Sequence, residues 1–261
     1  MSRLQLEQID AAYRKKTVLR EVTLAAEPGE IVALIGPNGA GKSTVLKVAA
    51  GLLAPQKGRV QLEDRDITGL PAHERVDRGL AYCIQGGRVF PSLTVRENLA
   101  MGAGALSADE RADGTAAVLD VFPVLKDLLE RRAGLLSGGE RQALALGMVL
   151  VRRPQVLLLD EPSAGLAPRL VRDLLDTVRA LNEDWDLSIL LVEQNVRAAL
   201  RIANRAVALE NGSVTRTTEA PGKWLDGKEM EELFLGGRMD TNSHAPSQSN
   251  QINTRNYETR K

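Results

Sequence analysis

The chain has 261 residues, of which 43 % are hydrophobic and 26 % are charged, a balance that excludes a largely disordered chain and predicts a packed core. Lysine plus arginine equals aspartate plus glutamate at 34 each, so the composition lacks the basic excess of nucleic-acid-binding proteins and we expect no nucleic-acid partner. The single cysteine, Cys83, excludes an internal disulfide and a CxxC metal or redox motif.

The predicted strands are of two kinds. Near the N-terminus, apolar residues alternate with polar ones, as in a half-buried antiparallel sheet. The alternating pairs are Leu4 and Leu6, Val22 and Leu24, and Val60 and Leu62. The segments 31–36, 156–160 and 188–193 are instead continuous apolar runs, which favour parallel strands covered by helices on both faces. We therefore predict an α/β fold with a mostly parallel core and a small antiparallel sheet.

Residues from about 90 to 153 are predicted to form an inserted helical lobe. Thr94 and Glu97 form a capping box before a helix over Val95–Ala103, and a second amphipathic run covers 116–131. The longest apolar stretch, 143–151, is too short to cross a bilayer, so we expect any role at a membrane to come through another subunit.

Two features are predicted for the last hundred residues. Pro168 is a favourable first helical residue, and apolar residues from 170 to 181 then recur at helical spacing. Residues 238–261 are polar with few apolar side chains, so we expect a disordered tail after a domain that spans 1–237.

The strongest chemical signal is a complete GxxxxGK[ST] motif between an apolar strand and a helical segment. Its residues are Gly36, Pro37, Asn38, Gly39, Ala40, Gly41, Lys42, Ser43 and Thr44. The glycines let backbone N–H groups converge on phosphate oxygens at a helix N-terminus. We expect Lys42 to reach the outer phosphates, Ser43 to bind Mg²⁺ and Thr44 to lie near the α-phosphate.

Two adjacent acids follow the apolar run 156–159. Asp160 ends a buried strand at its carboxyl edge, where α/β sites open, and we expect it to hold Mg²⁺. Glu161 lies one residue further, where its carboxylate would polarise the attacking water as a general base. The motif and the two acids together predict hydrolysis of a nucleoside triphosphate.

A second glycine-rich segment is Leu136-Ser137-Gly138-Gly139-Glu140. Ser137 and Glu140 alone satisfy the capping box of the following helix, which is the structural alternative. Two glycines at a helix start cost stability, however, and they expose N–H groups to an anion, which favours phosphate recognition by Ser137, Gly138 and Gly139. One chain would then carry two phosphate-binding surfaces, and a second copy would close them together.

These motifs resemble the nucleotide-binding domain of ABC ATPases over roughly residues 3–237. The resemblance implies a P-loop NTPase with a RecA-like core, an N-terminal antiparallel β subdomain and an inserted α-helical subdomain, with ATP and Mg²⁺ as cofactors. It also implies that LSGGE binds the γ-phosphate of ATP held by the opposite ATPase subunit. By the same resemblance Tyr13 would stack on adenine, and Gln85 would sense Mg²⁺ and connect the two lobes.

A closer resemblance is to the F-type ATPase subunit of branched-chain amino acid importers. The matching segments are 87–99, 165–168, 192–195, 209–212 and 235–237. It implies work with a second ATPase subunit, transmembrane permeases and, indirectly, a periplasmic or extracellular solute-binding protein, at the cytoplasmic face of the cell membrane. Importers of urea, amides or other polar solutes remain an alternative, as does a soluble ABC ATPase outside transport.

The sequence departs from the wider family at two positions and from the importer branch at one. Gln194 stands where most ABC ATPases carry a switch histidine, Ala167 where many carry an aspartate, and Gly87 where the importer branch often has arginine. Glutamine hydrogen-bonds but does not titrate near neutral pH, so we expect no rate inflection from position 194. A subunit that binds nucleotide while its partner hydrolyses it remains a third hypothesis.

Overall fold

The computed structural model describes residues 4–225. Its ten strands within that range are β1 (Leu4–Tyr13), β2 (Lys16–Ala26), β3 (Ile31–Ile35), β4 (Lys57–Leu62), β5 (Arg65–Asp66), β6 (Leu80–Cys83), β7 (Val156–Asp160), β8 (Ser188–Val192), β9 (Arg205–Glu210) and β10 (Ser213–Thr218). The α-helices in the same range are α1 (Lys42–Ala49), α2 (Ala72–Asp77), α3 (Val95–Ala103), α4 (Ala108–Val121), α5 (Gly138–Leu150), α6 (Pro168–Trp185) and α7 (Val196–Ile202). The predicted tail 238–261 and the domain end at 237 lie outside the described residues.

A six-stranded sheet in the order β10-β9-β3-β8-β7-β6 forms the centre of the fold. All its pairings are parallel except that of β9 with β10. Successive side chains of a strand point to opposite faces, and here both faces are covered. Ile31, Ala33 and Ile35 of β3 belong to the core under α5, α6 and α7, whereas Val32 and Leu34 belong to the core around α1. This double burial explains why the parallel strands are continuous apolar runs.

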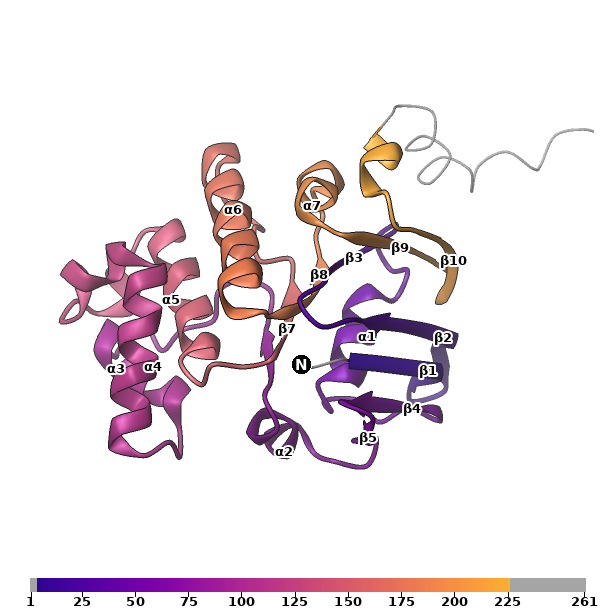
Figure 1. Ribbon diagram of the computed structural model, residues 1–261, viewed down its shortest axis with the longest axis horizontal. Helices are drawn as coiled ribbons and strands as arrows, with labels where there is room; N and C mark the ends of the chain where they lie inside the picture. The colour runs from indigo at the N-terminus through magenta and orange to yellow at the C-terminus, as the bar shows by residue number, and fades with distance from the viewer. Residues whose placement is uncertain (1–3, 226–261) are drawn as a thin grey trace, which may run out of the picture.

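The second sheet has the order β2-β1-β4-β5 and is antiparallel. Leu4 pairs with Ala26 and with Leu62, and Leu6 pairs with Leu24 and with Val60. These side chains are buried in the same cluster as α1, so the two sheets enclose that helix (Figure 1). The predicted alternation and the predicted antiparallel sheet are confirmed.

Helices α3, α4 and α5 lie together at one end of the molecule, on the far side of β7 from α1 (Figure 1). The capping box of Thr94 and Glu97 and the helix Val95–Ala103 are confirmed. The predicted amphipathic run 116–131 does not form one continuous helix, because α4 ends at Val121 and a 3₁₀ helix, η1 (Pro123–Leu128), follows. Proline disfavours helical geometry in the preceding residue, and Phe122 accordingly has φ −122° and ψ 73°.

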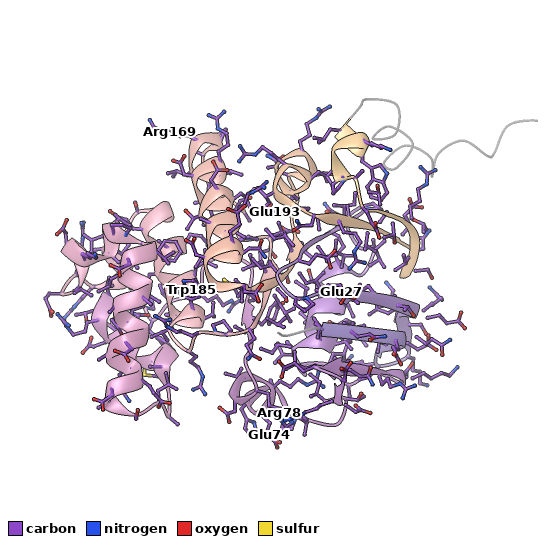
Figure 2. All side chains as sticks on the ribbon, viewed as in Figure 1. Glu27, Glu74, Arg78, Arg169, Trp185 and Glu193 are labelled. Carbon is purple, nitrogen blue, oxygen red and sulfur yellow. The ribbon has the colours of Figure 1, made fainter. Side chains whose placement is uncertain are left out.

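The helices α5, α6 and α7 cover one face of the six-stranded sheet. Helix α6 begins at Pro168 as predicted and ends at Trp185, and Figure 2 labels Arg169 and Trp185 near its two ends. Two short 3₁₀ helices, η2 (Ala133–Leu135) and η3 (Pro221–Leu225), complete the described structure. No helix within residues 4–225 has the length and apolar character that a membrane crossing requires.

Candidate nucleotide-binding site

The loop that joins β3 to α1 depends on glycines at two positions. Gly36 has φ +149°, and a Cβ there would lie 2.0 Å from the carbonyl oxygen of Leu209. Gly41, the N-cap of α1, has φ +109°, and its Cβ would lie 2.7 Å from a methyl group of Leu19. Only glycine suits such positions, because it tolerates positive φ and leaves room for close backbone approach. The predicted phosphate loop therefore wraps the N-terminus of α1.

Lys42, the first residue of α1, points back along this loop. Its Nζ donates hydrogen bonds to the carbonyl oxygens of Gly36 at 2.8 Å and Pro37 at 3.0 Å. The side chain is buried, and burial lowers the pKa of the ammonium, while the carboxylates of Glu161 and Asp160 act in the opposite direction. The carboxylates thus help to keep a positive charge at the mouth of the loop.

Asp160 is buried at the end of β7, and both of its oxygens accept hydrogen bonds. Oδ1 accepts one from the Ser43 hydroxyl at 2.9 Å, and Oδ2 accepts one from the Tyr82 hydroxyl, also at 2.9 Å. Ser43 belongs to α1 and Tyr82 to β6, so the carboxylate joins three elements that are distant in sequence. Burial is the main cause that raises the pKa of Tyr82, which therefore stays protonated and donates.

Glu161 adopts a backbone conformation that is rare for residues other than glycine. Its φ is +47°, and its N–H donates to the carbonyl oxygen of Val192 on β8 at 2.8 Å. Strained residues of this kind cluster at functional sites, where the surrounding structure holds them in place. The side chain is only partly buried, and its Oε2 accepts a 2.6 Å hydrogen bond from Nε2 of Gln85. Gln85 follows β6, so the structure brings these two predicted site residues together.

The glycine-rich start of α5 is a separate surface. Ser137 is the N-cap of α5, and its hydroxyl and the Glu140 carboxylate form the predicted reciprocal capping box. A Cβ on Gly138 would meet Leu166 at 3.7 Å, and one on Gly139 would meet Leu170 at 3.3 Å. The segment thus lies against the start of α6, and Figure 1 shows α5 and α1 on opposite sides of β7. The capping alternative and an anion-binding role are compatible, because the cap leaves the first N–H groups at the helix end.

Tyr13 and Gln194 are both exposed and come from two further strands, β1 and the end of β8. Tyr13 ends β1 and is 43 % exposed, and Nζ of Lys47 on α1 lies 5.9 Å from the centroid of its ring. Gln194 is exposed just after β8. The preceding residue, Glu193, is buried, and Figure 2 labels it between α6 and α7.

Two residues that were not assigned a role from the sequence take part in this arrangement. Tyr82 holds Asp160, and Glu193 accepts hydrogen bonds from the Ser163 N–H at 2.9 Å and hydroxyl at 2.8 Å. The only sequence signal for either is a polar group at the carboxyl end of an apolar strand. That signal shows where a side chain starts but not the partner that it reaches.

The comparisons with known proteins agree with this geometry. A family model described as ABC transporter matches residues 19–164. The probable branched-chain amino acid transport ATP-binding protein LivF of Archaeoglobus fulgidus is 42 % identical over 89 % of this chain and 98 % of its own length. The chain belongs to the ABC transporter ATPase family.

Further relatives of this ABC ATPase are named for amino acid transport and for lipopolysaccharide export. The high-affinity branched-chain amino acid transport ATP-binding protein BraG of Pseudomonas aeruginosa is 39 % identical over 90 % of this chain and all of its own. The lipopolysaccharide export system ATP-binding protein LptB of Escherichia coli K12 is 33 % identical over 90 % of this chain and 98 % of its own. The chain is thus an ATP-hydrolysing subunit of a transporter.

Solved structures show the same fold. The ADP conformation of the ATP-binding cassette MJ1267 matches with a TM-score of 0.80 and 28 % identity, covering 90 % of this chain and 99 % of that one. A dimeric post-hydrolysis state of the cassette MJ0796 bound to ADP and Pi matches with a TM-score of 0.73 and 26 % identity, covering 83 % and 98 %. The predicted ABC ATPase fold is confirmed.

Proposed function

We propose that residues 36–44 bind the phosphates of ATP and that Ser43, Asp160 and Gln85 hold Mg²⁺ beside them. The described side chains fit this ion, because Mg²⁺ prefers oxygen ligands and combines one or two protein groups with substrate phosphates. The Ser43 hydroxyl and the Asp160 carboxylate already lie 2.9 Å apart. Within residues 4–225 no cluster of three His, Cys, Asp or Glu side chains could hold a metal alone, which suits an ion shared with a nucleotide. When bound, the ion neutralises phosphate charge.

We assign ATP hydrolysis to Glu161 and the residues around it. Glu161 would accept a proton from the attacking water, and its hydrogen bond from Gln85 orients the carboxylate. Gln194 would contribute a hydrogen bond from the neighbouring β8 loop, and Tyr13 would stack on adenine beside Lys47. The observation that carries the proposal is the convergence of Lys42, Ser43, Asp160 and Glu161 at one end of β7.

The second phosphate surface implies a dimer. Ser137, Gly138 and Gly139 lie against the start of α6, away from the loop before α1. Within one chain they would therefore not contact phosphates bound to that loop. We propose that they bind the γ-phosphate of ATP held by a second ATPase subunit in a head-to-tail pair. The dimeric form of the related cassette bound to ADP and Pi supports this arrangement.

We further propose a permease contact at an apolar groove of about 330 Å³ beside Gln85. The groove lies between the core, which contributes Leu52, Val76 and Ile84, and the helical lobe, which contributes Met148 and Val149. Leu52 is 55 % exposed and Ile84 is 43 % exposed, and such apolar patches mark interaction sites. A short helix of a permease subunit is the occupant that fits the role of the relatives in transport systems.

The transported solute is proposed from the relatives. Identity is 42 % and 39 % to the two branched-chain amino acid proteins and 33 % to the lipopolysaccharide exporter subunit, which favours import of branched-chain or related amino acids. The subunit would work at the cytoplasmic face of the cell membrane, held by permeases that receive solute from a binding protein. Urea, amides and other polar solutes are the alternative cargo.

The test is purification of the full chain from native membranes in detergent, followed by identification of its membrane partner and reconstitution for uptake of labelled leucine, urea and acetamide. We expect a permease to co-purify and leucine uptake to require ATP. Ile84→Glu should lose the permease, whereas Val124→Glu, at an equally exposed apolar residue outside the groove, should retain it. Uptake of urea but not leucine would select the alternative, and ATP-driven release of lipid would overturn import.

A further inference from the structure

Tyr82 contacts both the apolar groove and the Asp160 carboxylate. Its side chain lines the apolar groove together with Leu52 and Ile84. Its hydroxyl leaves the groove and donates a 2.9 Å hydrogen bond to Oδ2 of Asp160. One side chain therefore touches both the surface proposed for the permease and the carboxylate proposed for Mg²⁺.

The strand register explains how one tyrosine reaches both. Tyr82 on β6 pairs with Leu158 on the parallel strand β7, and Asp160 lies two residues further along β7, on the same face as Leu158. That face is the one covered by α1, which carries Ser43. A phenol is long enough to cross from one strand to the end of the next, and phenylalanine of the same shape lacks the donor.

The Asp160 carboxylate is held at both oxygens. Ser43 donates to Oδ1 and Tyr82 donates to Oδ2, and the side chain is only 4 % exposed. A planar group with two fixed hydrogen bonds has one remaining orientation. Groups that bond to a metal ligand in this way orient it and contribute to metal affinity.

From these contacts we propose that Tyr82 is a positioning residue that fixes Asp160 for metal binding, and that it links occupancy of the groove to that carboxylate. This inference rests on the proposed roles of Asp160 and the groove. A helix seated between Leu52 and Ile84 would press on the Tyr82 ring. Any displacement of the ring moves the hydroxyl, and with it the hydrogen bond that orients the metal ligand.

The first experiment measures metal binding directly. Mn²⁺ bound to the full chain with a non-hydrolysable ATP analogue is quantified by electron paramagnetic resonance, for the wild type, Tyr82→Phe and Glu183→Gln. We expect Tyr82→Phe to weaken Mn²⁺ binding about tenfold, in line with the loss of a group that orients a ligand. Binding of the analogue in EDTA should be unchanged, and Glu183→Gln, on an exposed face of α6 outside the groove, should match the wild type.

Each result of this experiment has a distinct meaning. Equal Mn²⁺ affinity of Tyr82→Phe and wild type overturns the positioning role while leaving nucleotide binding intact. Failure of the wild type to bind the analogue with Mn²⁺ overturns the proposed function itself. Tyr82→Phe removes only one hydroxyl, so we expect the variant to fold. A thermal melt followed by far-ultraviolet circular dichroism checks this for each variant.

The second experiment tests the link to the groove. Leu52→Cys is alkylated with N-ethylmaleimide, in the wild-type background and together with Tyr82→Phe. Burial raises the pKa of the Cys83 thiol to about 12, so the native cysteine stays unreactive. We expect alkylation to change Mn²⁺ affinity about fivefold when Tyr82 is present and to leave it unchanged in Tyr82→Phe. No change in either background, or the same change in both, overturns the link.

Discussion

The loop before α1 and the turn before α5 are both glycine-rich helix starts, yet they are held in different ways. Around the first, hydrogen bonds join residues that are far apart in sequence, as between Ser43 and Asp160. Around the second, Ser137 and Glu140 satisfy each other within four residues. In the proposed function, the cleft assembled from several strands is nearly complete within one chain, whereas the self-contained cap would supply half of a site. The two regions should therefore respond differently to substitution.

The largest expected effect is on the chemical step at the assembled cleft. Glu161→Gln removes the proposed general base but keeps the shape that Gln85 contacts, so we expect hydrolysis to fall by about 10²–10⁴ while ATP binding persists. Phosphate release and calorimetric ATP binding measure the two quantities. Glu183→Gln, on an exposed face of α6, serves as the control. An unchanged rate in Glu161→Gln would remove this carboxylate from the mechanism.

The next effect is on ATP binding at the same cleft. Lys42→Ala deletes the buried cation beside the loop carbonyls, and we expect ATP affinity to fall roughly 100-fold, the scale of a lost charge-assisted interaction. Titration calorimetry provides the measurement, with the exposed Lys57→Ala as the control. Retention of wild-type affinity would mean that the phosphates bind elsewhere.

The same contrast explains how much the sequence could predict. The loop at 36–44, the capping boxes at 94–97 and 137–140, and the apolar strands are local patterns, and each is present in the structure. The amphipathic run 116–131 is divided between two elements, because Pro123 ends α4. The tyrosine that holds Asp160 and the carboxylate that holds Ser163 could not be predicted, because those bonds depend on which strands become neighbours.

The third effect belongs to the self-contained cap. Gly138 is helical with its nearest neighbour 3.7 Å from an added Cβ, so Gly138→Ala should stabilise the chain slightly, by about 0.5–1 kcal/mol. The methyl group would nevertheless stand where a phosphate approaches the first N–H groups. We expect hydrolysis to fall roughly tenfold with unchanged ATP binding by the isolated chain. A thermal melt, calorimetry and phosphate release measure the three quantities.

Mixing the two variants would sharpen this result. If the two surfaces meet across a pair of identical chains, a mixed dimer of Lys42→Ala and Gly138→Ala has one site with both halves intact. Equimolar mixing should then restore roughly a quarter of the wild-type sites, since half of the dimers are mixed. The mixture could instead be no more active than the mean of the two separate variants. The loop before α1 and the turn before α5 would then act in the same chain's site, or the dimer would need a different second subunit.

The smallest effect concerns Glu193, which connects the assembled cleft to the loop that carries Gln194. Its buried carboxylate accepts hydrogen bonds from Ser163 and from the backbone N–H groups of Gln194 and Asn195. Glu193→Gln replaces one acceptor oxygen by a donor that faces other donors. We expect hydrolysis to fall a few-fold at saturating ATP, with binding unchanged. Asn182 variants would not share this effect, because Asn182 bonds to Gly29 and Leu187 just before β3 and β8, at the opposite end of these strands from Glu193.

Glu193 also predicts a pH dependence of stability. Burial is the largest cause of its shifted pKa and raises it above 4.5, while the hydrogen bonds from Ser163 oppose the shift. Between 4.5 and the raised value the folded state binds more protons than the unfolded state, so its contribution to stability is full below pH 4.5 and is lost as the pH rises. The stability of the wild type minus that of Glu193→Gln should thus increase as the pH falls from 7 towards 4.5. Urea denaturation of both proteins across that range measures the difference, and a difference that decreases instead would show a carboxylate stabilised in its charged form.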